Sequence, residues 1–237
     1  YSGVVMICVG LMCLSPLLID LIYFEFNYSC FIIPGVFSVI LGYICMKTLD
    51  KYSRSKMKLK HGMMISSIAW MWACIVGGVV ISLATGTDFL NGIFESTSAL
   101  TGTGITMFDN VEILPHSILF FRAFEQWVGG LGVVVMVIGV LTRPGTATAK
   151  LYQSEAREER LKPSVKTTLK KTIEIYLIYT IVGIILYHLA GMPTFDSICN
   201  TFCMIATGGM SVKNANIGYY HNDLIYLISI VLMILGA

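Results

Sequence analysis

The chain has 237 residues, of which 56% are hydrophobic and only 13% carry a charge. This composition excludes an ordinary soluble domain, in which roughly 25% of residues are charged. The net charge is +2, and no basic segment is interleaved with aromatic residues, so nothing favours nucleic-acid binding. We therefore expect an all-α polytopic membrane protein that is surrounded by a lipid bilayer and has no nucleic-acid partner.

Long apolar runs predict transmembrane helices, because a helix needs about 20 residues to cross a hydrocarbon core of roughly 30 Å. The first run lacks the basic segment and cleavage site of a signal peptide, which favours a membrane helix. A sixth run begins near Leu224 and reaches only Ala237, and the chain opens at Tyr1 without an initiator methionine, so we expect a fragment of a longer protein. The complete runs are residues 3–22, 30–48, 62–85, 116–141 and 173–191.

Basic residues are concentrated in two connections between these runs. Of the 16 Lys and Arg residues, six lie within residues 47–60 and eight within residues 143–171. Lys and Arg in short loops are retained on the cytoplasmic side, so both connections and the N-terminus should be cytoplasmic. We predict a multi-pass protein of the cytoplasmic (inner) membrane whose outward connections are acidic.

The first outward connection departs from a plain helical bundle. Thr87 and Asp88 form a plausible N-cap, and the apolar segment at residues 89–100 is too short to span a bilayer. This segment predicts a re-entrant pore helix. The polar stretch Thr101-Gly102-Thr103-Gly104 follows it, and Pro115 opens the next long helix.

The same order returns after the fifth run. Pro193 and Thr194 start a short apolar segment at residues 195–205, and the polar stretch Ala206-Thr207-Gly208-Gly209 follows. An offset of 105 residues aligns Gly104 with Gly209 and superposes the two units. A repeated order of elements indicates a structural repeat. We therefore predict parallel repeats of helix, re-entrant pore loop and helix, preceded by two extra transmembrane helices.

The two polar stretches are predicted to form a cation filter. Backbone that is neither helix nor closed barrel survives at membrane depth only where it is buried in protein or lines water. A re-entrant helix that ends near the bilayer centre directs its negative dipole end and free carbonyls at the next segment. Carbonyls of that segment can replace the water around a dehydrated ion. The predicted filter residues are Thr101, Gly102, Thr103, Gly104, Ala206, Thr207, Gly208 and Gly209.

Five motifs carry a family resemblance: Glu95-Ser-Thr-Ser-Ala-Leu-Thr-Gly-Thr-Gly104, Pro115-His-Ser-Ile-Leu-Phe-Phe-Arg122, Gln126-Trp-Val-Gly-Gly-Leu-Gly132, Ala206-Thr-Gly-Gly209 and Ile217-Gly-Tyr219. They resemble the TrkH, TrkG and KtrB potassium transporters of the Trk/Ktr/HKT superfamily. The chain departs from that family's pattern at Gly102, where many relatives have Thr, and at Glu125, where an apolar residue is usual.

The resemblance implies four such units around one pore, of which this chain would be the N-terminal half. It implies K⁺ as the transported ion, since a glycine at the position of Gly104 goes with potassium preference in that family. It also implies a homodimer and a cytosolic nucleotide-binding regulatory subunit. The expected parts are residues 1–61 (two leading helices and a basic loop), 62–141 (first unit), 142–165 (cytoplasmic linker) and 166–237 (second unit, truncated in its last helix).

Three charged residues at predicted membrane depth are candidate supports of the pore. Arg122 and Glu125 are three apart on one helix and can pair on one face. We favour a structural ion pair there, near the outer interface, over direct contact with the permeating ion. Glu95, in the pore helix, could bond the filter backbone or shape the field of the vestibule, and both roles stay open.

The chain shows no nucleophile beside a base, no metal cluster and no phosphate-binding loop in its sequence, so we expect neither an enzyme nor a cofactor. The predicted function is potassium uptake across the cytoplasmic membrane, through a pore lined by backbone carbonyls of the filter residues. The alternative is a broken-helix secondary transporter of a small anionic solute. That class would predict inverted repeats rather than parallel ones.

Overall fold

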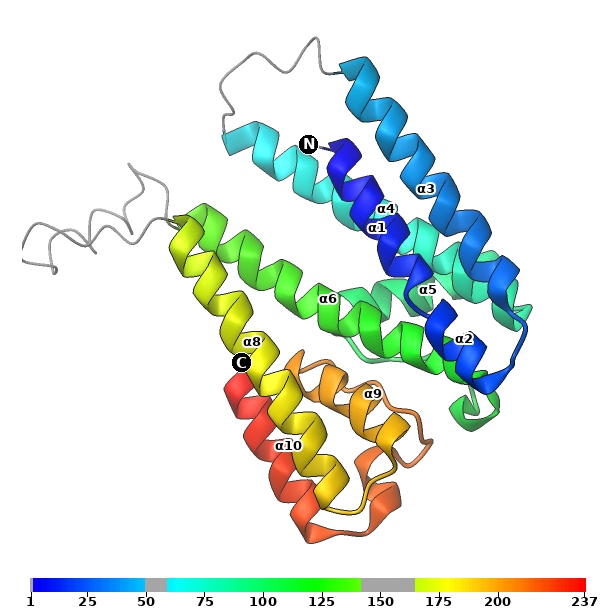
Figure 1. Ribbon diagram of the computed structural model, residues 1–237, viewed down its shortest axis with the longest axis vertical. Helices are drawn as coiled ribbons and strands as arrows, with labels where there is room; N and C mark the ends of the chain where they lie inside the picture. Colours follow the sequence, from blue (N-terminus) through cyan, green and yellow to red (C-terminus); the bar gives the residue numbers. More distant parts are fainter. Residues whose placement is uncertain (1, 50–58, 142–164) are drawn as a thin grey trace, which may run out of the picture.

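The computed structural model describes residues 2–49, 59–141 and 165–237, and within these residues the regular elements are all helical (Figure 1). The predicted linker at residues 142–165 lies outside the described residues except for its last residue. Most basic residues of the two predicted cytoplasmic connections also lie outside them. The division into four parts therefore stays a prediction.

A leading helical hairpin precedes the repeats. Its helices are α1 (Ser2–Leu14), α2 (Leu17–Tyr23) and α3 (Tyr28–Leu49), and α3 runs back along α1 (Figure 1). The sequence predicted one unbroken run at residues 3–22, but the helix is interrupted after Leu14. Pro16 has no N–H for the carbonyl of Met12, which instead accepts from Ser15 N at 3.2 Å and Ser15 Oγ at 2.8 Å.

Two units of the same construction follow. Each has a long helix, a short helix at the position of the predicted pore helix, a 3-10 turn in the predicted outer loop, and a further helix. The first unit comprises α4 (Leu59–Thr85), α5 (Phe89–Leu100), η2 (Val111–Ile113) and α6 (His116–Leu141), and the second comprises α8 (Val165–Leu189), α9 (Thr194–Ile205), η3 (Asn216–Tyr220) and α10 (Asp223–Gly236).

The predicted offset of 105 residues is confirmed at both ends of the pore helices. It converts the bounds of α5 into those of α9, Phe89 into Thr194 and Leu100 into Ile205. The residues that precede the two helices have nearly equal backbone angles, φ −55° and ψ 144° at Asp88 against φ −53° and ψ 146° at Pro193. Asp88 occupies the predicted N-cap position, but its side chain makes no capping hydrogen bond.

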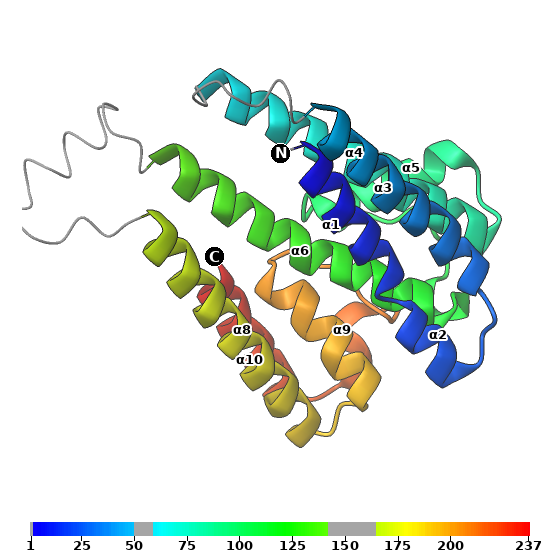
Figure 2. The ribbon, with the colours of Figure 1, turned by 45° about the horizontal axis from the view of Figure 1, so that its top comes forward.

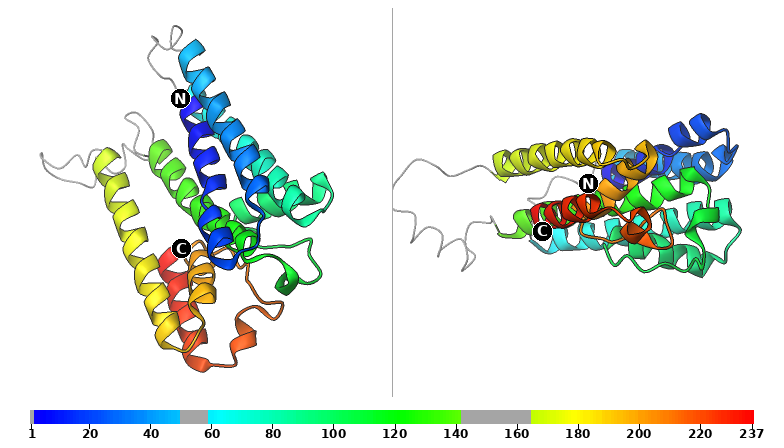
Figure 3. Two further views of the ribbon diagram at one scale, coloured as in Figure 1. Left: turned by 45° about the vertical axis from the view of Figure 1, so that its right-hand side comes forward. Right: turned by 90° about the horizontal axis from the view of Figure 1, so that it is seen from below.

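Within the part of the chain that the structure describes, four helical stretches are long and apolar enough to cross a membrane: Ser2–Tyr23, Tyr28–Thr48, Gly62–Thr85 and Thr167–Leu189. Large apolar side chains on them are exposed, among them Leu18, Met63 and Ile181. Exposed apolar surface of this extent would be a liability in water and is normal against lipid. The N-terminus lies at the same end of the molecule as the last turns of α3 and α6 and the first turns of α4 and α8 (Figure 3).

Helix α6 joins the two units. It packs against α5 of its own unit and against α8 and α9 of the next (Figure 2). An aromatic seam fills the space between the units, in which Phe120, Phe124 and Trp127 of α6 lie against Phe202 of α9. Trp127 Nε1 also donates to Thr180 Oγ1 of α8 at 3.0 Å. The two units therefore meet along α6.

The N-terminus of α6 is capped by a residue of the leading hairpin. Glu25, between α2 and α3, accepts at Oε2 from Ser117 N at 3.0 Å and Ser117 Oγ at 2.6 Å, and at Oε1 from His116 N at 2.5 Å. The first N–H groups of a helix have no partner inside it, and a carboxylate complements the positive end of the helix dipole. Burial alone would raise the pKa of Glu25, but the hydrogen bonds from Ser117 and His116 lower it below its ordinary value.

Glu25→Gln is expected to lower the stability of the protein in detergent at neutral pH by about 0.5–2 kcal/mol, the usual range for loss of a helix cap. Because the pKa of Glu25 is lowered by folding, its carboxylate stabilises the fold fully above the ordinary value of 4.5. This stabilisation is lost as the pH falls through the lowered value. Melting curves of both proteins from about pH 7 down to about pH 3 measure the difference.

The matched control is Asp88→Asn, at an N-cap position where the side chain caps nothing. It should change neither the stability nor its pH dependence. A Glu25→Gln difference that stays constant toward acid pH would contradict the capping role.

Candidate functional site

The two predicted filter segments have the same backbone conformation. After each pore helix, Thr101 and Ala206 stay in the helical region, with φ −81° and −74°. The next residues, Gly102 and Thr207, turn to the left-handed region with φ +69° and +53°. Two residues later Gly104 and Gly209 do so again, with φ +75° and +82°.

Backbone hydrogen bonds repeat in the two segments as well. Thr103 N donates to Ser98 O at 3.0 Å, and at the equivalent position Gly208 N donates to Cys203 O at 2.9 Å. Thr207 adopts a conformation that is rare for a β-branched residue, whereas Gly102 adopts it without strain. Gly102, which stands where many relatives have Thr, is therefore compatible with the conformation of the first segment.

The segments lie side by side without intervening side chains. A Cβ atom built on Gly102 would lie 3.8 Å from both Gly208 Cα and Ala206 O. A Cβ atom built on Gly104 would overlap the carbonyl group of Gly208. Glycine is thus required at residue 104 both by its positive φ and by the closeness of the neighbouring segment.

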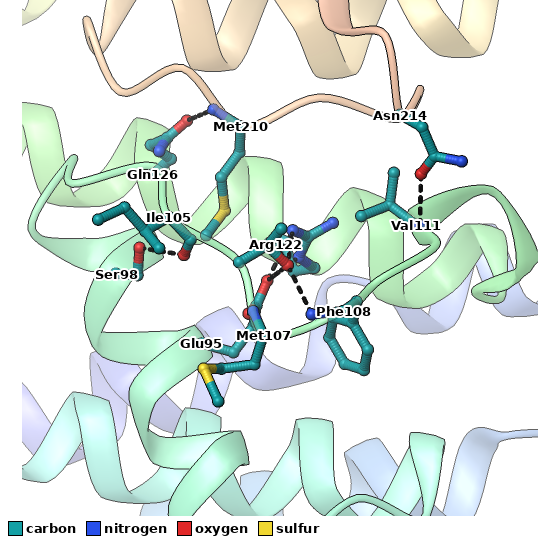
Figure 4. A network of polar contacts seen from close by, with 11 residues as sticks. Glu95, Ser98, Ile105, Met107, Phe108, Val111, Arg122, Gln126, Met210 and Asn214 are labelled. Atoms are coloured by element: carbon teal, nitrogen blue, oxygen red, sulfur yellow. Dashed lines mark hydrogen bonds and ion pairs between the residues drawn. The ribbon is translucent and has the colours of Figure 1, made fainter.

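Behind the first segment, Glu95 of α5 and Arg122 of α6 form a buried ion pair (Figure 4). The exposed fractions of the two side chains are 0% and 2%. Arg122 Nε donates to Glu95 Oε1 at 2.7 Å, and the same oxygen accepts from Thr106 Oγ1 at 2.9 Å. Glu95 Oε2 accepts from Met107 N at 2.8 Å. Glu95 therefore holds the backbone just after the predicted filter residues. Its two predicted roles, bonding the filter backbone and shaping the field of the vestibule, stay predictions.

The predicted pairing of Arg122 with Glu125 is wrong. Arg122 reaches across to Glu95, because that carboxylate lies on the pore helix facing α6 and accepts from several groups at once. Glu125 lies instead against Ser96, whose Oγ donates to Glu125 Oε1 at 2.6 Å, and against Gly77 of α4. Its Oε2 is buried, and no described residue offers it a hydrogen bond.

The second segment is anchored differently. The residue equivalent to Glu95 is Asn200, which accepts only a long hydrogen bond of 3.4 Å from Ser211 Oγ. Gln126 of α6 supplies another contact: its Oε1 accepts from Met210 N at 3.2 Å, and its amide lies directly against Gly208 (Figure 4). On the outer side, Asn216 Nδ2 donates to Gly209 O at 3.0 Å.

The outer loops of the two units are joined by Asn214. Its Oδ1 accepts from Val111 N at 2.8 Å (Figure 4). Its Nδ2 donates to Asn110 Oδ1, also at 2.8 Å. Beneath this link lies a polar cavity of about 250 Å³, lined in part by Gly104 and Gly209. Both predicted filter segments therefore contribute a residue to the lining of one cavity.

The structure brings the two predicted filter segments together, with Gly102 and Gly104 close to the second segment. Glu95 and Arg122 pair with each other beside Thr106. Glu125 does not line the cavity and lies against Ser96 and Gly77. The sequence prediction missed Gln126 and Asn214. Gln126 stood in a quoted motif, and an amide in an apolar helix was a usable signal because a buried amide needs partners. Asn214 gave no such signal, since asparagine is common in loops.

Comparisons with known proteins agree with this architecture. The family model described as "TrkH: Cation transport protein" matches residues 32–237. An uncharacterised cation transporter of Methanocaldococcus jannaschii is 39% identical over 238 residues, which covers 100% of this chain and 49% of the relative. The Escherichia coli K12 potassium uptake protein TrkG is 32% identical over 222 residues, which covers 91% of this chain and 46% of the relative.

A solved structure is also similar. The crystal structure of the potassium transporter TrkH from Vibrio parahaemolyticus matches with a TM-score of 0.84 at 29% identity, covering 97% of this chain and 47% of that one. The predicted all-α membrane fold and the resemblance seen in the sequence are thereby confirmed. This chain spans about half the length of the relatives it matches.

Arg122→Met and Glu95→Gln are each expected to lower the free energy of unfolding in detergent by about 3–5 kcal/mol, because each removes one side of a buried, hydrogen-bonded pair. The double variant should lose clearly less than the sum of the two single losses. A double-mutant cycle on unfolding free energies measures this coupling.

Lys213→Met is the control, because its ammonium lies over the ring of Tyr219 in an outer loop and forms no buried ion pair. Lys213→Met should lower the free energy of unfolding much less than Arg122→Met or Glu95→Gln does. Additive losses for Arg122 and Glu95 would show that the pair does not act as a unit.

Proposed function

We propose that this chain, which belongs to the TrkH family of cation transport proteins, lines a potassium-uptake pore with its two filter segments, residues 101–104 and 206–209. Potassium would pass as a dehydrated ion, coordinated by backbone carbonyls of these segments. The similarity to the TrkH and TrkG potassium uptake proteins supports potassium as the ion.

One observation carries the proposal: two chemically similar, glycine-bearing segments adopt the same irregular backbone and lie side by side at the ends of two pore helices. Such backbone is stable in a membrane only where protein or a water-filled path surrounds it. Each pore helix ends at its filter segment, so its negative dipole end and last carbonyls favour a cation there.

The proposed setting is the cytoplasmic (inner) membrane, with the N-terminus in the cytoplasm. The concentration of Lys and Arg in the two connections at residues 47–60 and 143–171 supports this orientation. Acidic residues such as Asp109 and Glu112 would then face outward and raise the local concentration of cations. The chain would act as a non-enzymatic transporter without a cofactor.

Two partners belong to the proposal through the family resemblance. The pore protein would form a homodimer and would bind a cytosolic nucleotide-binding regulatory subunit. The basic connection at residues 143–171 would lie on the same side as that subunit.

Gly104→Ser in the full-length parent protein is expected to weaken growth of a potassium-uptake-deficient bacterium on limiting potassium. A side chain at residue 104 meets the carbonyl of Gly208 and a φ of +75°. A strain of roughly 1–2 kcal/mol in the filter corresponds to a loss of about tenfold in the preference for K⁺ over Na⁺. Uptake of the two ions is measured side by side, with the cytosolic partner present.

Gly218→Ser is the matched control, because nothing lies within 4 Å of a Cβ atom at that outer-loop position. It should retain growth and selectivity. Absence of potassium uptake by a well-expressed parent protein would contradict the proposed function, and an unchanged preference in Gly104→Ser would contradict the filter.

A further inference from the structure

The two filter segments differ in what holds them, although their backbones match. The first is held from its own pore helix by Glu95, which accepts from Met107 N at 2.8 Å and from Thr106 Oγ1 at 2.9 Å. In the second unit Asn200 replaces this carboxylate, and its hydrogen bond to Ser211 is 3.4 Å long. A neutral amide whose only hydrogen bond to this stretch is long is a much weaker anchor than a carboxylate with several short ones.

The missing anchor is replaced by a residue of the other unit. Gln126, on α6, is fully buried, and its Oε1 accepts from Met210 N at 3.2 Å. The donor is a backbone N–H, so the acceptor must be the amide oxygen and the orientation of the amide is fixed. A Cβ atom on Gly208 would overlap Gln126 Cδ, so the side chain lies directly on the filter backbone.

This contact continues into the first segment. Gly208 lies between Gln126 on one side and Gly102 and Gly104 on the other, and its carbonyl would overlap a side chain at residue 104. A shift of Gln126 would therefore move Gly208 relative to Gly104. The spacing of the two segments depends on the size and position of one amide.

The amide also has an unmet donor. Gln126 Nε2 is buried and has no hydrogen-bond partner among the residues that the structure describes. Buried polar groups are nearly always paired, so each exception needs a reason. Here the reason is the place of the amide: its oxygen is fixed by Met210 N and its body by Gly208, which leaves Nε2 no freedom to seek an acceptor.

We propose that Gln126 is the positioning residue of the second filter segment, which it holds from the first unit, and that it thereby sets the spacing on which discrimination between K⁺ and Na⁺ depends. The consequence for selectivity rests on the proposed function. The anchoring of Met210 does not, and it can be measured separately.

The test uses the full-length parent protein with Gln126→Met, which keeps the length of the side chain and removes the acceptor. Potassium and sodium uptake are measured in the same cells, and amide hydrogen exchange is measured on the peptide containing Met210 in detergent. We expect the K⁺-over-Na⁺ preference to fall by about threefold to tenfold, the equivalent of one lost hydrogen bond. Exchange at Met210 should become faster.

Two further variants separate positioning from general packing. Gln126→Glu keeps the acceptor oxygen and the shape, and should keep Met210 protected. Trp127→Phe removes the neighbouring inter-unit hydrogen bond to Thr180, which touches neither filter segment. It should leave both the selectivity and the exchange of Met210 unchanged.

Unchanged selectivity and unchanged exchange in Gln126→Met would overturn the proposal. The proposal would also be overturned if K⁺ and Na⁺ uptake fell equally, and by the same amount in Gln126→Met and Trp127→Phe. Such losses would indicate only a weakened aromatic seam. If the unaltered parent takes up no potassium, the proposed function fails. In that case the amide exchange of Met210 still tests whether Gln126 anchors this residue. Faster exchange in Gln126→Met supports the anchoring, and unchanged exchange overturns it.

Discussion

Irregular backbone at membrane depth must be surrounded by protein, and the rest of this fold follows from that constraint. Each pore helix stops after 12 residues and is followed by a segment that cannot satisfy its own polar groups as a helix would. Side chains supply partners for the backbone that leaves each segment: Glu95 for Met107 N, Gln126 for Met210 N and Asn216 for Gly209 O. Under the proposed function, the carbonyls that face the neighbouring segment would be left for an ion.

Anchoring by a carboxylate has a further requirement, because a buried charge needs a counter-charge. Arg122 meets it for Glu95, and both are almost fully buried. The second segment avoids the requirement, because the amides near it are neutral: Asn200 of its own pore helix and Gln126 of the first unit. Hence the first filter segment is held within its own unit, whereas the second is held partly by its neighbour.

Local patterns in the sequence predicted the elements well, because hydrophobic run length and the repeat of 105 residues are local signals. They predicted both pore helices to within one residue, Phe89–Leu100 and Thr194–Ile205. The partners of charged side chains were not predictable in the same way. Arg122 had Glu125 within reach on its own helix, and only the packing of α5 against α6 shows that Glu95 is closer. Gln126 likewise acquires its role only where the second unit meets α6.

Helix α6 can serve both filter segments because its contacts with them lie on one stripe. Arg122, Gln126, Gly129 and Gly130 fall within an arc of about 100° on a helical projection. Gly129 lies against the carbonyl of Leu100, where the first pore helix ends, and Gly130 lies against Ala206 in the second segment. The aromatic seam occupies the opposite face of α6. One helix thus backs both filter segments with one face and joins the units with the other, so a displacement of α6 must act on both segments at once.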